Sequence, residues 1–294
     1  MKESQSYCGI LLIIGRSNVG KSTLFNRLLG KKLSIITSKP HTTRHCILGI
    51  HTEGMYQAVY MDTPGLHING EEKCNSLIKN NIYDYLNYVN LIIFIVEGTR
   101  WMQNDIMIVN KLRNINIPVL LVVNKIDHIY DRSFLLPHLK FLSQQMNFIE
   151  IIPISAKTGV NIDLLIKIVR KYLPKANHKF PKEYLTDRSN YFIVSEIIRE
   201  KLMRFLGAEL PYSINVEIEQ FLIKKNDSCH IYALIVVDQL SQKKIVIGKK
   251  GKKIKIIGTE ARKDIEEIFK KTIYLTLWVK VKSKFIDIDK YLQC

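Results

Sequence analysis

The sequence predicts an α/β domain whose sheet is mostly parallel with one antiparallel edge strand, followed by a smaller α+β domain. Short apolar runs alternate with helical patterns as far as Tyr172, which is typical of an α/β fold. The alternation stops near Pro174, and helix and strand patterns then follow in a different order. A chain of 294 residues also exceeds what one hydrophobic core usually holds, which favours two domains.

The first domain is predicted from apolar runs that have the length of buried strands. These runs are Cys8–Ile14, Val59–Met61, Leu91–Val96, Val119–Val123 and Ile149–Ile154. Helical patterns separate them at Ser22–Leu29 and Asp105–Asn114, and a helix over Asn161–Tyr172 is predicted to close the domain. The turn signal Glu53 and Gly54 lies between His45–Thr52 and Met55–Tyr60, which predicts a hairpin that adds the antiparallel edge strand.

The second domain is predicted from the pattern that follows the polar stretch Lys175–Arg188. We expect a first domain over residues 1–174, a linker over 175–188 and a second domain over 189–294. Its expected elements are helix Ser189–Leu206 ended by Gly207, strands Ser213–Lys224 and Cys229–Val237, helices around Gly251–Ile257 and Thr259–Lys270, and strand Thr272–Lys282. This order is α-β-β-α-α-β.

Composition limits the class of protein and the kind of partner. A formal net charge of +17 indicates a polyanionic partner, and both nucleic acid and anionic lipid fit it. The five cysteines show no C-x-x-C pair, which favours neither a disulfide framework nor a zinc site and indicates a reducing cytoplasm. A polar stretch at Met1–Tyr7 and the lack of a long apolar run disfavour secretion and a transmembrane anchor, so any membrane contact is expected to be peripheral.

A phosphate-binding loop is predicted at Gly15–Ser22, which matches G-x-x-x-x-G-K-[ST] between a predicted strand and a predicted helix. Glycines let backbone N–H groups curl around phosphates, and the start of the helix adds its dipole. Lys21 is expected to reach the β and γ phosphates, and Ser22 to offer an oxygen to Mg²⁺. A glycine-rich turn without a ligand is the alternative for this motif taken alone.

Asp62–Gly65, of sequence DTPG, comes directly after a predicted strand. At the carboxyl end of a strand Asp62 can hold Mg²⁺ through water, while the Gly65 N–H faces the γ-phosphate.

Base selection is predicted from Asn124–Asp127, of sequence NKID, and from Ser155–Lys157. Asp127 can accept hydrogen bonds from N1–H and the N2 amino group of guanine, which adenine does not present together, so this motif selects GTP over ATP. The Ala156 N–H can donate to guanine O6, and the aliphatic stem of Lys125 can lie along the base. The predicted nucleotide-binding residues are Gly15, Asn18, Val19, Gly20, Lys21, Ser22, Thr23, Asp62, Thr63, Pro64, Gly65, Asn124, Lys125, Asp127, Ser155, Ala156 and Lys157.

Four motifs in this order, each after a strand, resemble the P-loop GTPase domain of translation-factor-related GTPases. The resemblance implies that Thr42–Arg44 is switch I, where one threonine, Thr43 or Thr42, reaches Mg²⁺ and the γ-phosphate. The expected catalytic residues are Lys21, Thr43 and Gly65, and the expected Mg²⁺ ligands are Ser22, Thr43 and Asp62.

One departure concerns hydrolysis, because Leu66 stands where many small GTPases carry the glutamine that orients the attacking water. In related GTPases with an apolar residue there, the asparagine that Asn18 matches helps to bind K⁺. We therefore expect slow, K⁺-stimulated hydrolysis, with Asn18 as a plain turn residue as the alternative.

An RNA site is predicted at Gly248–Gly251, which lies inside Ser241–Gly258, a stretch with seven lysines and no acidic residue. Within the α-β-β-α-α-β order, this loop resembles the G-X-X-G loop of a type II KH domain, in which glycines let the backbone approach unpaired nucleotides. A solvated lysine-rich turn is the alternative. The predicted RNA-binding residues are Ile247, Gly248, Lys249, Lys250, Gly251, Lys252 and Lys253.

Segments outside these motifs resemble the Era family of bacterial ribosome-assembly GTPases, within the TrmE-Era-EngA-YihA-Septin group. They are His41–His45, His51–Gly54, Glu97–Trp101, Arg199–Leu202 and Leu206–Tyr212. The resemblance implies a cytoplasmic, GTP- and GDP-binding enzyme that binds the 3′ end of 16S rRNA through its KH domain and acts in 30S subunit maturation, with peripheral association with the inner membrane. A monomer is favoured. Ser17 departs from the proline common in this phosphate loop.

Two other functions remain open at this point. Leu66 is compatible with an RNA-binding chaperone module whose GTP turnover is negligible. A signalling GTPase at a membrane surface would use the lysine clusters for anionic lipid, but the sequence shows no amphipathic helix with a clear basic face.

Overall fold

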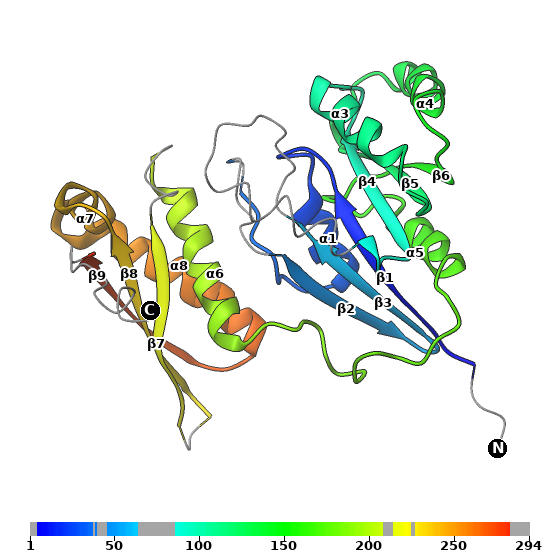
Figure 1. Cartoon of the computed structure of the whole chain (residues 1–294). Helices are drawn as coiled ribbons and strands as arrows, with labels where there is room; N and C mark the ends of the chain where they lie inside the picture. The colour runs from blue at the N-terminus through cyan, green and yellow to red at the C-terminus, as the bar shows by residue number, and fades with distance from the viewer. Residues whose placement is uncertain are drawn as a thin grey trace, which may run out of the picture. The chain divides into compact units, whose positions relative to one another are not determined.

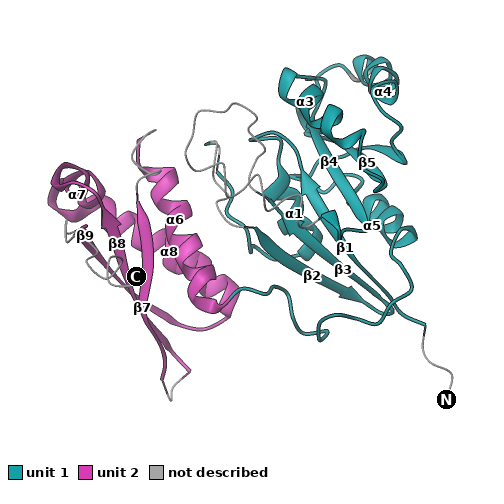
Figure 2. Ribbon diagram, in the orientation of Figure 1, with its two compact units in different colours: residues 1–188 teal, residues 189–294 magenta. Residues whose placement is uncertain are grey.

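The computed structural model describes residues 5–37, 39, 46–63, 86–207, 214–224 and 227–282. The chain divides into two compact units, residues 1–188 and 189–294 (Figure 2). Within the described ranges, no helix is both long and apolar enough to cross a membrane.

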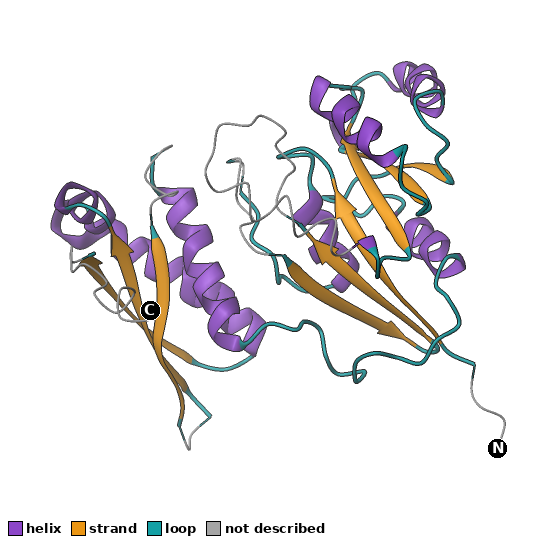
Figure 3. Cartoon of the chain, viewed as in Figure 1, coloured by secondary structure: helices purple, strands orange, loops and turns teal. Residues whose placement is uncertain are grey.

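Unit 1 is built on a six-stranded sheet with helices on both faces (Figures 1 and 3). Its elements are β1 (Tyr7–Ile14), α1 (Lys21–Leu29), β2 (Ile47–Glu53), β3 (Tyr56–Asp62), β4 (Leu91–Glu97), α3 (Gln103–Leu112), β5 (Val119–Asn124), α4 (Leu135–Ser143), β6 (Glu150–Pro153) and α5 (Ile162–Lys171). The strand order is β2-β3-β1-β4-β5-β6, and among the strands that the structure describes only the β2–β3 pair is antiparallel. The predicted sheet with its antiparallel edge strand is therefore confirmed.

Each face of this sheet buries apolar side chains against helices. Residues that alternate along the central strands, such as Ile92, Phe94 and Val96, pack with Ile108 of α3 and Leu142 of α4. Helices α1 and α5 contact the strands from the other face. Because both faces are covered, the central strands are apolar along their whole length, which is why they appear in the sequence as uninterrupted runs.

The segment over residues 175–188, predicted as a linker, lies along the edge of unit 1. The Ile50 N–H donates to the Leu185 carbonyl at 2.8 Å, so part of the outer edge of β2 is paired. Gln57, which is fully buried, accepts from the Lys179 and Phe180 N–H groups at 2.8 and 3.0 Å and donates to the Phe180 carbonyl at 2.7 Å. One side chain thus fixes the course of this segment.

Unit 2 combines helices with a three-stranded sheet of order β7-β8-β9. Its elements are α6 (Asn190–Phe205), β7 (Asn215–Ile223), β8 (Cys229–Val237), α7 (Leu240–Ile247), a short 3-10 turn at Lys249–Gly251, α8 (Lys252–Phe269) and β9 (Ile273–Val281). Strand β8 pairs antiparallel with β7 and parallel with β9. The predicted α-β-β-α-α-β order is confirmed.

The predicted positions of the two later helices were wrong. The structure has one continuous helix, α8, where a break was expected at Gly258. A Cβ at this position would meet Leu277 Cδ1 of β9 at 3.3 Å, which is a tight contact. This glycine therefore permits close packing of α8 on β9 and does not end the helix. The other helix, α7, comes before the lysine-rich loop, and the Gln242 side chain caps its start by accepting from the Asp238 and Gln239 N–H groups at 2.8 and 3.1 Å.

Candidate functional site

The topology brings the described parts of the four sequence motifs to one edge of the sheet in unit 1. Strand β1 leads into Gly15, β3 ends at Asp62, β5 ends at Asn124, and β6 is followed by Ser155. These strands run parallel, so their carboxyl ends lie along the same edge. In open α/β sheets this edge is where ligands bind.

The loop between β1 and α1 adopts a backbone conformation that favours glycine at position 20. Gly20 has a φ of 101°, and a Cβ at this position would lie 2.3 Å from Nδ2 of Asn124. A side chain here would therefore collide with the motif at the end of β5. Gly20 immediately precedes α1, and the first N–H groups of a helix have no carbonyl partner within the helix, so they favour an anion there.

Lys21 is the first residue of α1 and is 7% exposed. Its ammonium donates to the carbonyls of Gly15 and Arg16 at 3.0 and 2.9 Å. Burial lowers the pKa of Lys21 to about 8, although the nearby Asp62 carboxylate acts in the opposite direction. The phosphate loop thus holds a poorly hydrated cation, so an anion that reached it would bind strongly.

Asp62 is fully buried at the end of β3. Its Oδ2 accepts from the hydroxyls of Ser22 and Ser34 at 2.8 and 2.7 Å, whereas its Oδ1 has no hydrogen-bond partner among the described residues. Burial raises the pKa of Asp62, and the Ser34 and Ser22 hydrogen bonds together with the Lys21 charge lower it. A neighbouring link ties this strand to β1, because the Thr63 hydroxyl donates to the Ile13 carbonyl at 2.9 Å.

The donor set around Asp62 suits a magnesium ion. A carboxylate and a serine hydroxyl are the hard oxygen ligands that Mg²⁺ prefers. The unpaired Oδ1 of a completely buried carboxylate carries a desolvation cost that a cation would remove. Ser22 and Asp62 therefore fit the ion, and their separation of 2.8 Å between oxygens lets both face it.

Asn124 joins the phosphate loop to the loop after β6. Its Nδ2 donates to the Val19 carbonyl at 2.8 Å, and its Oδ1 accepts from the Ala156 N–H at 2.9 Å. Ala156 was expected to donate this N–H to guanine O6. Because it already donates to Asn124, a base oxygen could reach it only as a second acceptor or after the Asn124 amide moves.

Asp127 is positioned from the neighbouring loop, because its carboxylate accepts from the Ser155 hydroxyl at 2.7 Å. His128 Nε2 lies 3.3 Å from the other carboxylate oxygen. Burial opposes ionisation of Asp127, but the Ser155 hydrogen bond and other polar contacts outweigh it and lower its pKa. The group therefore stays an anion, which accepts hydrogen bonds and donates none.

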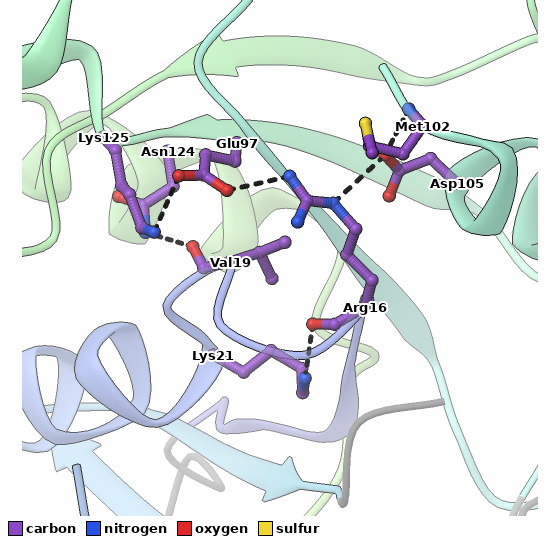
Figure 4. A network of polar contacts seen from close by, with 8 residues as sticks. All are labelled: Arg16, Val19, Lys21, Glu97, Met102, Asp105, Asn124 and Lys125. Atoms are coloured by element: carbon purple, nitrogen blue, oxygen red, sulfur yellow. Dashed lines mark hydrogen bonds and ion pairs between the residues drawn. The ribbon is translucent and has the colours of Figure 1, made fainter. Parts of the chain in front are cut away.

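A polar network lies between the phosphate loop and the loop after β5 (Figure 4). It is formed by Arg16, Glu97, Asp105 and Lys125. The Glu97 carboxylate contacts the Lys125 ammonium at 2.9 Å and the Arg16 guanidinium at 2.8 Å, and Arg16 also lies 3.4 Å from the buried Asp105. Burial opposes ionisation of Glu97, but Lys125 and Arg16 outweigh it and lower the pKa of this carboxyl.

Several predicted site residues lie outside the described residues, namely Thr42, Thr43, Arg44, Pro64, Gly65 and Leu66. Asn18, the expected K⁺ ligand, lies in the phosphate loop with a φ of 64° and is exposed. Thr23 lies in the first turn of α1, and Lys157 follows Ala156 in the loop after β6.

The lysine-rich loop of unit 2 connects α7 to α8. Gly248 has a φ of 72°, and a Cβ there would lie 2.6 Å from the Cβ of Lys253, so the tight turn requires glycine. Lys249, Lys250 and Lys252 are exposed. Large apolar side chains remain exposed on the adjoining helices, with Ile245 at 47% and Ile256 at 49%. The loop therefore combines positive charge, a backbone without bulky side chains at its ends, and nearby apolar surface.

Sequence reasoning missed Ser34, Arg16 and Glu97. Ser34 is held by Asn26, whose side chain accepts from the Leu33 and Ser34 N–H groups at 2.9 and 2.8 Å and donates to the Ser34 carbonyl at 2.7 Å. No motif includes this pair, and only the fold brings Ser34 to Asp62. For Glu97 the sequence offered a signal beyond the family resemblance of Glu97–Trp101, since this residue ends an apolar strand in the same way as Asp62 and Asn124 do.

Comparisons with known proteins match both units. A family described as 50S ribosome-binding GTPase matches residues 10–125, and a KH domain family matches residues 209–284. GTPase Era of Yersinia pestis (strain Pestoides F) is 56% identical over 289 residues, which cover 98% of this chain and 95% of the relative. GTPase Era of Yersinia pseudotuberculosis serotype O:1b (strain IP 31758) gives the same values.

Solved structures agree over nearly the whole length. The crystal structure of Era in complex with MgGDPNP and nucleotides 1506–1542 of 16S ribosomal RNA matches with a TM-score of 0.87 at 36% identity, over 95% of each chain. The structure of an Aquifex aeolicus Era variant bound to GDP.AlF4- gives the same TM-score, identity and coverage.

Proposed function

The chain belongs to the Era family of GTPases, and from this membership we propose that it couples GTP hydrolysis to binding of the 3′ end of 16S rRNA during 30S subunit assembly. The observation that carries the proposal is the presence in one chain of a sheet edge in unit 1 that bears the phosphate loop and the Asp127 carboxylate, and of a glycine-bounded lysine loop in unit 2. We also propose the division into a G domain over residues 1–174, a linker over 175–188 and a type II KH domain over 189–294.

On the phosphate side, Lys21 releases the Gly15 and Arg16 carbonyls and contacts the β and γ phosphates of GTP. Ser22 and Asp62 hold Mg²⁺ together with Thr43. A Mg²⁺ ion held there would supply positive charge that offsets the negative charge of the phosphate oxygens. The N–H groups of the first turn of α1 and of Gly65 orient the phosphates, so hydrolysis depends on positioning and electrostatics.

On the base side, Asp127 accepts the two donors of the guanine edge while Ser155 fixes its carboxylate. Lys125 lies along the base with its aliphatic stem. Asn124 keeps the phosphate loop and the loop after β6 at a fixed spacing. Adenine would leave the Asp127 carboxylate without its partners, which is the reason for selectivity.

Replacing Asp127 by asparagine tests the base site. An asparagine amide cannot accept from both guanine donors, so GDP affinity should fall by about 1,000-fold or more, and xanthosine diphosphate, which offers an oxygen in place of the N2 amino group, should bind better. Equilibrium binding of both nucleotides measures this. The Asp131→Asn variant is the matched control, because Asp131 is an exposed carboxylate that hydrogen-bonds Ser133 near the same loop. Unchanged preference for GDP in the Asp127→Asn variant would contradict the proposed base site.

On the RNA side, we propose that Lys249, Lys250, Lys252 and Lys253 contact phosphates of single-stranded RNA. The loop glycines let the protein backbone approach the RNA closely, and we place Ile247, directly before the loop, in the same RNA site. The Lys249→Ala/Lys250→Ala variant should bind an oligonucleotide of the rRNA 3′ end more weakly, with a salt dependence shallower by roughly 0.7 for each lost phosphate contact. Lys263→Ala, on the exposed side of α8, is the control. An unchanged salt slope would rule out this loop as the RNA site.

Coupling between the two sites can be measured directly. We expect the chain to bind the rRNA oligonucleotide more tightly with a non-hydrolysable GTP analogue than with GDP, and RNA must then favour GTP by the same factor. Equal affinity would make the KH domain an independent tether. Single-turnover GTPase assays with and without small subunits separate this switch from the second candidate, an RNA-binding chaperone module with negligible GTP turnover, with which the leucine at position 66 is compatible.

Membership of the Era family also supports proposals about the hydrolysis rate, the location and the oligomeric state. We propose slow hydrolysis that K⁺ stimulates through Asn18, a cytoplasmic location with peripheral association with the inner membrane, and a monomeric state. Equal hydrolysis rates in K⁺ and Na⁺ would contradict the role of Asn18. Flotation with anionic vesicles and sedimentation equilibrium test the membrane association and the monomer.

A further inference from the structure

We infer that Glu97 is a positioning residue of the nucleotide site, whose carboxylate fixes the Lys125 side chain on the base side and the Arg16 side chain on the phosphate side. The inference rests on the proposed placement of the nucleotide, since it assigns a role to groups on either side of that ligand. Glu97 itself would not touch the nucleotide and acts only through these two cations.

The backbone holds Glu97 firmly at the edge of the sheet. It is the last residue of β4 and pairs in register with Asn124, the last residue of β5. The next residue, Gly98, donates its N–H to the Asn124 carbonyl at 2.7 Å, and the Arg100 N–H donates back to the Glu97 carbonyl at 2.9 Å. This tight turn places the carboxylate between the two loops, where it is 19% exposed (Figure 4).

The contact with Lys125 bears on base binding. The Lys125 ammonium lies 2.9 Å from Glu97 Oε1, and the Lys125 side chain is 28% exposed. A lysine side chain has several rotatable bonds, and without an anchor its ammonium would move into water. With the end of the chain fixed by Glu97, the aliphatic stem is held in place before a base arrives, so less entropy is lost on binding.

The contact with Arg16 bears on the phosphate loop. The Arg16 guanidinium donates to Glu97 Oε2 at 2.8 Å and lies 3.4 Å from Asp105. Asp105 is itself fully buried and accepts from the Met102 N–H at 3.0 Å, so this end of the contact is anchored to α3. The backbone carbonyl of Arg16 is one of the two acceptors of the Lys21 ammonium. Fixing the Arg16 side chain therefore restrains the phosphate-loop backbone beside Lys21, on which the ammonium rests before it moves to the phosphates.

Positioning and simple charge make opposite predictions. Glu97 is an anion close to the binding site of an anionic nucleotide. If it acted through its charge alone, removing that charge would strengthen nucleotide binding. If it acts by holding Lys125 and Arg16, removing it frees both side chains and weakens binding. The sign of the change in affinity thus separates the two.

The experiment compares the wild-type chain with the Glu97→Ala and Glu97→Gln variants. Binding and dissociation of fluorescent GDP and of a fluorescent non-hydrolysable GTP analogue are followed by stopped flow, and hydrolysis is followed at saturating GTP. Glu97→Ala should weaken both nucleotides about tenfold, mostly through faster dissociation, since two partly exposed ion pairs are lost. Glu97→Gln, which keeps the shape and one acceptor oxygen, should have a smaller effect in the same direction. The value of KM should rise while kcat stays within about twofold.

Glu53→Gln is the matched control, because Glu53 also pairs with an arginine, Arg170, at the end of β2 and outside the nucleotide edge. It should leave affinity unchanged. Equal or tighter binding by Glu97→Gln and Glu97→Ala would overturn the inference, as would a lower melting temperature without any change in affinity. The Glu97→Gln variant alone decides the question if Glu97→Ala does not fold. A wrong placement of the nucleotide would be seen separately, as an Asp127→Asn variant that keeps the wild-type preference for GDP.

Discussion

Replacing Ser34 by alanine tests whether a residue outside every nucleotide-binding motif controls the carboxylate of the nucleotide site. Ser34 is 1% exposed, and its hydroxyl donates to Oδ2 of the fully buried Asp62 at 2.7 Å. Ser22 supplies a second hydroxyl to the same oxygen at 2.8 Å. Because alanine keeps the Cβ and removes only the donor, the substitution isolates one hydrogen bond to a buried anion.

The expected size of the effect follows from that hydrogen bond. A hydrogen bond to a charged group contributes about 1.5–3 kcal/mol when its partner is buried. The loss falls on the ionised form of Asp62, which is the form that binds Mg²⁺. At about 1.4 kcal/mol per factor of ten, the Mg²⁺ concentration for half-maximal GTPase activity should rise by roughly tenfold or more.

The pH dependence has a defined sign. Burial raises the pKa of Asp62, and the Ser34 hydrogen bond is the largest of the contacts that lower it. Removing Ser34 raises this pKa further, so the carboxyl protonates at a higher pH. The acid limb of GTPase activity, measured at subsaturating Mg²⁺, should therefore move to higher pH in the Ser34→Ala variant.

The assay is a set of Mg²⁺ titrations of GTP hydrolysis at several pH values, and Ser143→Ala is the control. Ser143 also loses a hydroxyl that donates at 2.8 Å, here to the Lys140 carbonyl on the exposed surface of α4. Identical Mg²⁺ requirements and identical acid limbs in the wild-type and Ser34→Ala chains would refute the reasoning, because Asp62 would then have no need of its second donor.

Three further predictions concern other buried polar groups. Burial lowers the pKa of Lys21 to about 8. Because the phosphates of GDP would raise this pKa, GDP binding above pH 8 should be accompanied by uptake of a proton. Calorimetry in buffers of different ionisation enthalpy detects this uptake, and the Lys21→Met variant should abolish it. Gln57→Ala leaves the Lys179 and Phe180 N–H groups without their acceptor and should lower the free energy of unfolding by about 3 kcal/mol in urea. Gln145→Ala, which loses one exposed hydrogen bond to the Phe141 carbonyl, should change it by less than about 0.5 kcal/mol. Equal losses would show that Gln57 does not fix this segment. The ammonium of buried Lys201 lies 2.6 Å from Asp264, so Asp264→Leu should cost about 3 kcal/mol and the Lys201→Met/Asp264→Leu pair much less, as thermal unfolding would report; additive losses would contradict a buried pair.

The sheet of unit 1 could be predicted from the sequence because its strands are buried on both faces. Such strands are continuous apolar runs, and β4 and β5 begin at the predicted residues and end one residue beyond the predicted ends. The motif residues follow the ends of these runs. Parallel pairing alone then brings them to one edge, so the grouping of Asp62, Asn124 and Ser155 needed no knowledge of side-chain contacts.

The helices that were missed or misplaced show where local patterns are insufficient. Helix α4 (Leu135–Ser143) contains Pro137, which argues against a helix but lies in the first turn, where a missing N–H costs little. Helix α7 buries only Val246, so it has almost no apolar periodicity to detect. In α8 the glycine at position 258 permits close packing on the neighbouring strand β9, and this contact cannot be seen in the helix sequence itself.

The network around Glu97 could not be predicted for a different reason, which is that its members come from separate elements and carry ordinary charges. Arg16 lies among the variable positions of the phosphate-loop motif, and Glu97 belongs to no nucleotide motif. The register between β4 and β5 places Glu97 beside Asn124, so its carboxylate lies next to the lysine that follows Asn124. In a parallel sheet the last residue of every strand lies beside the loops that follow the neighbouring strands. A charged residue there can hold two ligand-binding loops in place without contacting the ligand. A search of this edge for charged residues outside the motifs is therefore a physical way to find positioning residues in other domains of this fold.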